Sequence, residues 1–202
     1  MEDQGLRELA LKIYARHKDA LEFLFESRPG GEDNLLNVIR PSLDAREDLV
    51  PDRPTGMMLR FAPNNWANFP ALNACPREQW TKSRRNVSFE IKSFKSEANN
   101  FSDRISLALI LGPSEENLRR FLFDRIKKEP NVFIRAGNAI GQDWVTVYRR
   151  ELITKGESEK LTTEQKNTTL LERWESFLST DLPRLTEAMA RIAAEVPIAG
   201  PD

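Results

Sequence analysis

The spacing of apolar residues changes from a helical period to a strand-like period about 50 residues into the chain. The first apolar series predicts a helix over about residues 4–27, with charged residues on its opposite face. Its members are Leu6, Leu9, Ile13, Leu21, Leu24 and Phe25. A second helix is expected over about residues 32–46, broken or kinked near Pro41. The proline-rich residues 48–56 are expected to form a linker.

Downstream of this linker, apolar and polar residues alternate, which is typical of half-buried strands. The alternation predicts strands over 57–61, 87–94 and 104–111, with the last two as antiparallel neighbours. Two further strands are predicted over 132–135 and 144–150.

Two helical segments accompany these strands. Ser114 is placed to cap a helix that continues to about residue 128. A final helical region is expected over about 163–195, interrupted near Pro183. The order of elements predicts an α+β fold, in which a mostly antiparallel sheet of about five strands packs with N-terminal, central and C-terminal helices.

The length of 202 residues suits one compact unit, in which residues 1–47 form an N-terminal helical segment and residues 48–202 form the α+β sheet domain with its C-terminal helices. The sequence has no apolar run of about 18 residues and no charged-then-apolar leader at Met1. We therefore expect a cytoplasmic protein that makes no membrane contact.

The small number of cysteines and histidines narrows the possible chemistry. A single cysteine, Cys75, excludes an intramolecular disulfide and a zinc site built from several cysteines. A single histidine, His17, removes most histidine-based catalysis. Any catalysis would use carboxylates, lysines and hydroxyl groups.

The net charge of -1 conceals a basic centre between two acidic flanks. Residues 51–150 contain seventeen basic and ten acidic side chains, residues 1–50 seven and eleven, and residues 151–202 six and ten. Such a centre either attracts phosphate groups or packs against the acidic helices of the same chain. The sequence leaves both interpretations open.

One triplet in the predicted strand 87–94 matches part of a nuclease pattern. Glu90-Ile91-Lys92 follows Pro51-Asp52 by about forty residues, and nucleases of the PD-(D/E)XK class use two carboxylates to hold a divalent cation and a lysine beside the attacking water. Under this interpretation Asp52, Glu90 and Lys92 are catalytic and magnesium is the cofactor. The same triplet also fits an ordinary half-solvated strand, and nothing local brings Asp52 to Glu90.

A second candidate site is a basic surface for nucleic acid. Its members are Arg60, Arg84, Arg85, Lys92, Lys95 and Arg104, with Trp66 and Trp80 to stack on bases. In the alternative interpretation, the two tryptophans belong to the core and the arginines pair with acids of the terminal helices.

Four segments resemble the C-terminal half of a group of bacterial PD-(D/E)XK nuclease-superfamily proteins linked to defence against foreign DNA. These segments are Ile13–Pro29, Leu107–Pro113 with the helix that follows it, Trp144–Tyr148, and Trp174 through Pro183. In that group the catalytic acids and lysine lie in an N-terminal core, upstream of the segment with which this chain begins. The resemblance therefore implies that Glu90-Ile91-Lys92 is a coincidence and that no catalytic residue carries over.

The leading expectation is an accessory module that binds nucleic acid or a protein partner, uses no cofactor and does not cleave by itself. The first alternative is a divergent magnesium-dependent nuclease that uses Asp52, Glu90 and Lys92. The second is a protein-interaction or dimerisation module, in which the apolar stripes of the first and last helices contact a partner or another copy of the chain. Whether the protein is an enzyme stays open.

Overall fold

The computed structural model of the chain describes residue 17 and residues 35–52, 58–77, 80–96, 99–141 and 143–196, without side-chain detail for 95, 96 and 99–103. Its internal contacts divide the chain into two units, Met1–Asn34 and Leu35–Asp202. The predicted helix over 4–27 and the resembling segment Ile13–Pro29 lie, His17 apart, outside the described residues. The second unit has the α+β fold that the order of elements predicted, and its architecture follows.

The described part of this unit contains a five-stranded antiparallel sheet whose spatial order equals the sequence order. Its strands are β1 (Leu49–Pro51), β2 (Met58–Pro63), β3 (Val87–Ser96), β4 (Asn99–Leu111) and β5 (Val145–Ile153). The predicted pairing of the second and third alternating segments is confirmed, since Phe89 lies opposite Leu109 and Ile91 opposite Leu107.

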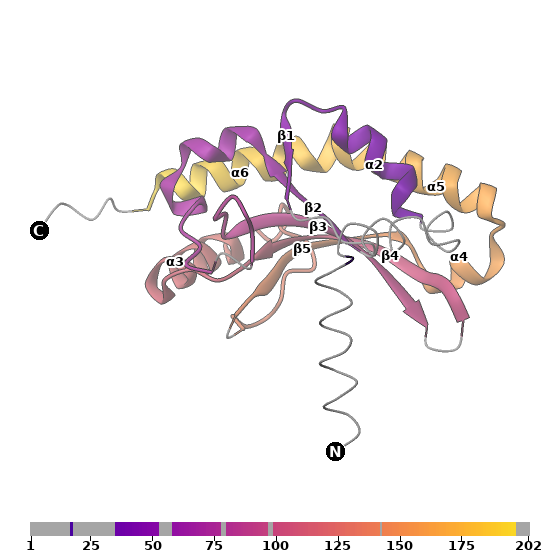
Figure 1. Ribbon diagram of the computed structural model, residues 1–202. Coiled ribbons are helices and arrows are strands. Elements are labelled where there is room, and N and C mark those ends of the chain that lie inside the picture. The colour runs from indigo at the N-terminus through magenta and orange to yellow at the C-terminus, as the bar shows by residue number, and fades with distance from the viewer. Residues whose placement is uncertain are drawn as a thin grey trace, which may run out of the picture. The chain divides into compact units, whose positions relative to one another are not determined.

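Helices cover one face of this sheet, as Figure 1 shows for α2, α5 and α6. The helices are α2 (Leu36–Asp44), α3 (Glu116–Lys127), α4 (Lys155–Lys160), α5 (Thr163–Ser176) and α6 (Leu182–Ala194), with short 3-10 turns η1 (Asn64–Asn68) and η2 (Pro70–Leu72). α2 continues through Pro41, so the helix is not broken at this residue. No helix in these ranges is both long enough and apolar enough to cross a bilayer.

Aromatic rings join the helices to the sheet. Phe89 stacks on Phe61 with 5.2 Å between ring centroids, and Phe177 meets Phe89 edge to face at 5.5 Å. Trp174 stacks on Phe177 at 5.6 Å. Because alternate residues of a strand point to opposite faces, the odd-numbered residues of β2 and β3 build this core and the even-numbered ones point away from the helices.

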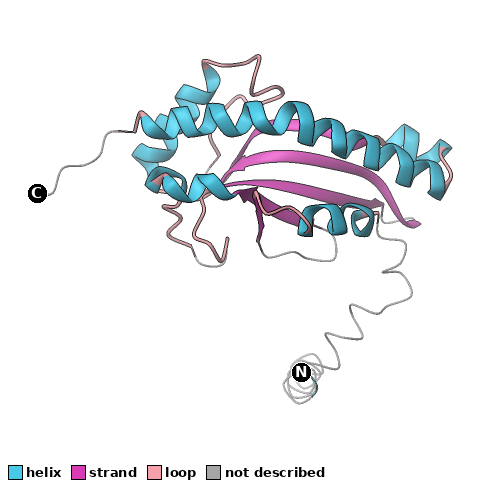
Figure 2. Ribbon diagram, turned by 90° about the horizontal axis from the view of Figure 1, so that it is seen from above, coloured by secondary structure: helices cyan, strands magenta, loops and turns pink. Residues whose placement is uncertain are grey.

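The predicted interruption near Pro183 takes the form of a π-helical turn, η3 (Phe177–Asp181), between α5 and α6. Figure 2 shows the C-terminal helices running as one continuous rod over the strands. Pro183 lies at the start of α6, directly after the π-helical turn, and as a proline it has no N–H to donate to a carbonyl of the preceding helical residues. The Asp181 carboxylate accepts hydrogen bonds from the Tyr148 hydroxyl at 2.8 Å and from Arg150 at 2.7 Å. Burial, and then the hydrogen bond to Asp181, raise the pKa of the Tyr148 hydroxyl.

Two local predictions about strands were wrong. The expected linker 48–56 begins with strand β1, whose Val50 lies opposite Ala62. The expected strand 132–135 consists of turns, because Arg135 adopts a left-handed backbone with φ of 57°. The segment still runs beside β5, since Ile134 accepts the Arg149 N–H at 3.1 Å and Gly137 donates to Thr146 at 2.8 Å.

The predicted cap of the central helix was also wrong. Glu115 occupies the N-cap position of α3, and no side chain caps this helix. The Ser114 hydroxyl is buried without a hydrogen-bond partner. Helix α4, which starts with a capping box between Thr154 and Glu157, was not predicted from the sequence.

Candidate functional site

The sheet face turned away from α2, α5 and α6 carries four of the charged residues that the sequence singled out, Arg60, Glu90, Lys92 and Arg104. We call it the polar face. It consists of Met58, Arg60 and Ala62 of β2, Ser88, Glu90, Lys92 and Phe94 of β3, Arg104, Ser106, Ala108 and Ile110 of β4, and Thr146, Arg149 and Glu151 of β5. Among these described side chains, four are cations and two are carboxylates. The face is therefore locally positive in a chain of net charge -1.

Glu90 lies in the middle of this face, 1% exposed, between two cations. Arg60 Nε donates to Glu90 Oε1 at 3.0 Å, and Lys92 Nζ lies 2.6 Å from Oε2. The Arg60 guanidinium also donates to the Trp80 carbonyl and lies 4.4 Å from the centre of the Trp80 ring. Arg60 and Glu90 thus form a buried ion pair, and Lys92, with 40% of its side chain exposed, connects the pair to solvent.

Asp52 follows β1 and is held by a loop. Its backbone N–H donates to the Arg60 carbonyl at 2.8 Å, so Asp52 lies beside Arg60 in the sheet. Its buried carboxylate accepts the backbone N–H groups of Lys82 at 2.9 Å and Ser83 at 3.2 Å, and also the Ser83 hydroxyl. Through these hydrogen bonds, Asp52 links the loop before β3 to the end of β1.

In the structure, the three candidate catalytic residues lie near one another across neighbouring strands of the sheet, and Asp52 and Glu90 are each held by protein donors. Asp52 and Glu90 lie on backbones two strands apart, a separation of about 10 Å, with Arg60 between them. Each carboxylate already accepts bonds from protein donors. In the described ranges no group of three histidine, cysteine, aspartate or glutamate side chains is arranged to hold a metal ion.

Two of the predicted nucleic-acid contacts are buried. Trp66 is fully buried in the core, where its indole N–H donates to the Thr186 carbonyl at 3.2 Å, so it offers no surface to a base. Arg85 is buried, donates to the Ala62 carbonyl at 3.4 Å, and has its pKa lowered by burial. Trp66 therefore belongs to the core, which was the alternative interpretation of the sequence.

The other predicted contacts differ in how far they reach solvent. Arg84 and Arg104 are exposed, and the Arg104 guanidinium lies 4.2 Å from the centre of the Phe94 ring. Trp80 is half-buried beneath Arg60. The side chain of Lys95 lies outside the described part of the chain.

Sequence reasoning missed two exposed residues at this site. Trp144 is 54% exposed, and Lys92 Nζ lies 5.9 Å from the centre of its ring. Arg149 is exposed beside Ala108. The alternating pattern of residues 144–150 predicted a strand but did not show that Arg149 faces away from the helices, because a register shift in the β4–β5 pairing changes which residues face them. Trp144 lies just before β5, outside this pairing.

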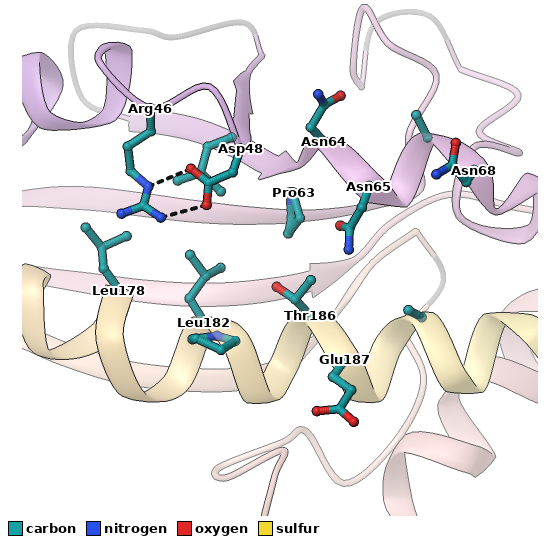
Figure 3. Close-up of a pocket in the computed structure, with 14 residues that line it drawn as sticks. Arg46, Asp48, Pro63, Asn64, Asn65, Asn68, Leu178, Leu182, Thr186 and Glu187 are labelled. Carbon is teal, nitrogen blue, oxygen red and sulfur yellow. Dashed lines mark hydrogen bonds and ion pairs between the residues drawn. The ribbon is translucent and has the colours of Figure 1, made fainter.

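Apart from the polar face, the structure has a concave pocket between the β1–η1 segment and the η3–α6 segment, with a volume of about 820 Å³ (Figure 3). We call it the groove. On its helical wall, four lining residues are spaced four apart. Both sides contribute apolar and polar residues to the lining. The wall is Leu178, Leu182, Thr186 and Ala190, the opposite side includes Leu49, Pro63, Asn64, Asn65 and Asn68, and Glu187 adds a carboxylate.

An ion pair closes one end of the groove. Arg46 Nε and Nη2 donate to the two carboxylate oxygens of Asp48 at 2.9 and 2.6 Å. This bidentate contact lowers the pKa of Asp48 and raises the pKa of Arg46. Figure 3 shows Asn65 pointing toward the helix and Leu178 and Leu182 pointing toward the strands.

No family model, no curated protein and no solved structure matches this chain.

Proposed function

We propose that the Leu35–Asp202 unit binds nucleic acid through its polar face and does not cleave it. One observation carries this proposal. Three cations of the face, Lys92, Arg104 and Arg149, reach solvent, whereas Glu90 is enclosed in its ion pair. Phosphate groups approaching this face would meet positive charge without contacting the Glu90 carboxylate, and such contacts bind the backbone without selecting a sequence.

The proposed binding is modest in strength. Glu90 already neutralises part of the charge of Lys92, and Glu151 places a half-buried carboxylate on β5. Three phosphate contacts predict that the logarithm of the association constant falls with the logarithm of salt concentration with a slope of about -2 to -3.

Binding of a fluorescent oligonucleotide to the purified chain, measured by anisotropy at about 50 and 200 mM salt, tests the proposal. We expect affinity to fall steeply as salt rises, and the double variant Arg104→Gln with Arg149→Gln to bind more weakly with a shallower slope. Arg120→Gln is the matched control, because Arg120 is an exposed cation of α3 that pairs with Glu116. Absent or salt-insensitive binding would contradict the proposal.

The absence of cleavage is the second half of the proposal. It rests on the protein donors that already occupy Asp52 and Glu90. Incubating plasmid with the wild-type protein and Mg²⁺ or Mn²⁺ tests it. Cleavage that disappears in Glu90→Ala and Lys92→Ala would favour the magnesium-dependent nuclease instead.

The groove favours a second candidate function, the binding of a protein partner. Residues 178–190 span about 18 Å of helix, which matches an extended peptide of about five or six residues. A helical ligand of that length would fill about 1,700 Å³, roughly twice the groove. Since Arg46 is paired with Asp48, the Glu187 carboxylate gives the lining a negative charge. We therefore propose an extended segment with alternating apolar residues and a lysine or arginine.

Selection from a library of displayed peptides tests this second candidate. Peptides enriched on the wild-type protein and lost on Thr186→Trp, which fills the groove, should share the alternating apolar pattern and a basic residue. Arg191→Trp is the control, because Arg191 lies on α6 and pairs with Glu129 outside the groove lining. Enrichment that survives Thr186→Trp would rule the groove out.

A further inference from the structure

Two cations of the polar face that reach solvent, Lys92 and Arg104, each lie beside an aromatic ring. Lys92 Nζ lies 5.9 Å from the Trp144 ring centre, and the Arg104 guanidinium lies 4.2 Å from the Phe94 ring centre. Lys92 and Phe94 are two residues apart on β3, a backbone distance of about 7 Å. The face therefore presents π surfaces next to the positive charges that would contact phosphates.

Trp144 is the most exposed of these rings. Its indole is 54% exposed, although burial of a tryptophan is strongly favourable in a folded protein. The backbone at this point is tightly placed, because a Cβ atom on Gly141 would lie 2.5 Å from the Trp144 carbonyl oxygen. Val145 begins β5 directly after it. The ring is thus held at the surface by a fixed backbone and by its contact with Lys92.

We infer that the nucleic acid bound by this face is single-stranded, an inference that rests on the function proposed above. In a duplex the bases are paired and stacked on one another, so no base face inside it is free to stack on Trp144. In a single strand a base is available to stack on Trp144 while neighbouring phosphates contact Lys92 and Arg104. Stacking of this kind tolerates any sequence, because every base has a π face.

Affinities for single-stranded and duplex oligonucleotides of one sequence and about 12 nucleotides test the inference at constant salt. We expect the single strand to bind at least about tenfold more tightly, and Trp144→Ala to weaken single-strand binding by about 5- to 100-fold. Trp144→Phe should retain most of the affinity because it keeps an aromatic face. Leu171→Ala, which removes another exposed apolar side chain, should change nothing.

The possible results separate the two proposals. If neither nucleic acid binds, the proposed function and this inference both fail. If duplex and single strand bind equally, or if Trp144→Ala leaves single-strand affinity unchanged, the function stands and the single-strand inference is overturned. Circular dichroism checks that Trp144→Ala is folded. If it is not, Trp144→Leu, which keeps apolar bulk without an aromatic face, takes its place with the same expected loss of single-strand affinity.

Discussion

Arg60 and Lys92 both pair with the buried carboxylate of Glu90. The Glu90-Ile91-Lys92 triplet resembles a catalytic motif because of its spacing alone. Residues two apart on a strand point to the same face, so an acid and a lysine at this spacing meet whether or not they catalyse a reaction. The sequence was sufficient to place Glu90 beside Lys92. It could not show that Arg60 from β2 completes the cluster, because that contact depends on the register between strands.

Replacing Glu90 by Gln should lower the free energy of unfolding by about 3 kcal/mol, because it leaves the buried Arg60 without its counter-charge. Urea denaturation measures the change. Glu116→Gln removes an exposed ion pair with Arg120 and should alter stability by less than about 1 kcal/mol. Equal effects of the two variants would show that Glu90 is not part of a buried pair.

Glu157 should make stability depend on acid pH. Hydrogen bonds from Arg173 and then from the Thr154 backbone lower its pKa from 4.5 to about 2. A depressed carboxyl pKa adds stability that is fully present above the unfolded value and is lost as pH falls toward the folded value. The free energy of unfolding should therefore decline between about pH 4.5 and pH 2.

Urea unfolding at several pH values in this window tests the dependence. Glu157→Gln should show a smaller decline than the wild type, whereas Glu172→Gln, at an exposed position of the same helix α5 as Arg173, should follow the wild-type curve. Parallel curves for wild type and Glu157→Gln would contradict the assignment.

The elements differ in how well a local pattern predicts them. β2, β3 and β4 were predictable because each buries one face, which imposes a period of two on the sequence. β1 was not predicted, because it has only three residues and prolines lie in and after it. The apolar residues Val132 to Ile134 suggested a strand, but the left-handed Arg135 turns the chain there.

Helix starts give a test of these local assignments. Thr162 accepts the backbone N–H of Gln165, so Thr162→Ala should lower the free energy of unfolding by about 1 kcal/mol. Ser114 makes no capping bond, so Ser114→Ala should change it by less than about 0.5 kcal/mol. Chemical denaturation of the two variants measures both values. A larger loss for Ser114→Ala would mean that Ser114 caps α3 in solution.

For the molecule as a whole, helix α2 belongs with the sheet. Leu36, Ile39 and Leu43 are buried, and the Trp174 indole donates to the Ser42 hydroxyl at 3.0 Å. The site also depends on tertiary structure, since Trp144 comes to Lys92 only through the path of the loop before β5. Such long-range placement leaves no periodic signal in the sequence, which is why Trp144 was missed and the position of Trp66 was left open.

Two fragments test the extent of this unit. Residues 35–202 should unfold cooperatively, because the contacts of this unit are largely internal. Residues 48–202 should lose about 5 kcal/mol or more, since three buried aliphatic side chains contribute about 1.5 to 3 kcal/mol each. Thermal unfolding followed by circular dichroism compares them. Equal midpoints would show that α2 is dispensable.

The sheet joins every strand to its neighbour along the chain, which bears on how the protein reaches this structure. Short connections join β1 to β2 and β3 to β4, over six and two residues, whereas 23 residues separate β2 from β3 and 33 separate β4 from β5. Because short loops close quickly, the β1–β2 and β3–β4 hairpins should form first. The contact between Ser42 and Trp174 bridges 132 positions and closes the longest loop described above. It should therefore form late, so that the two ends of this unit come together only after the hairpins between them have assembled.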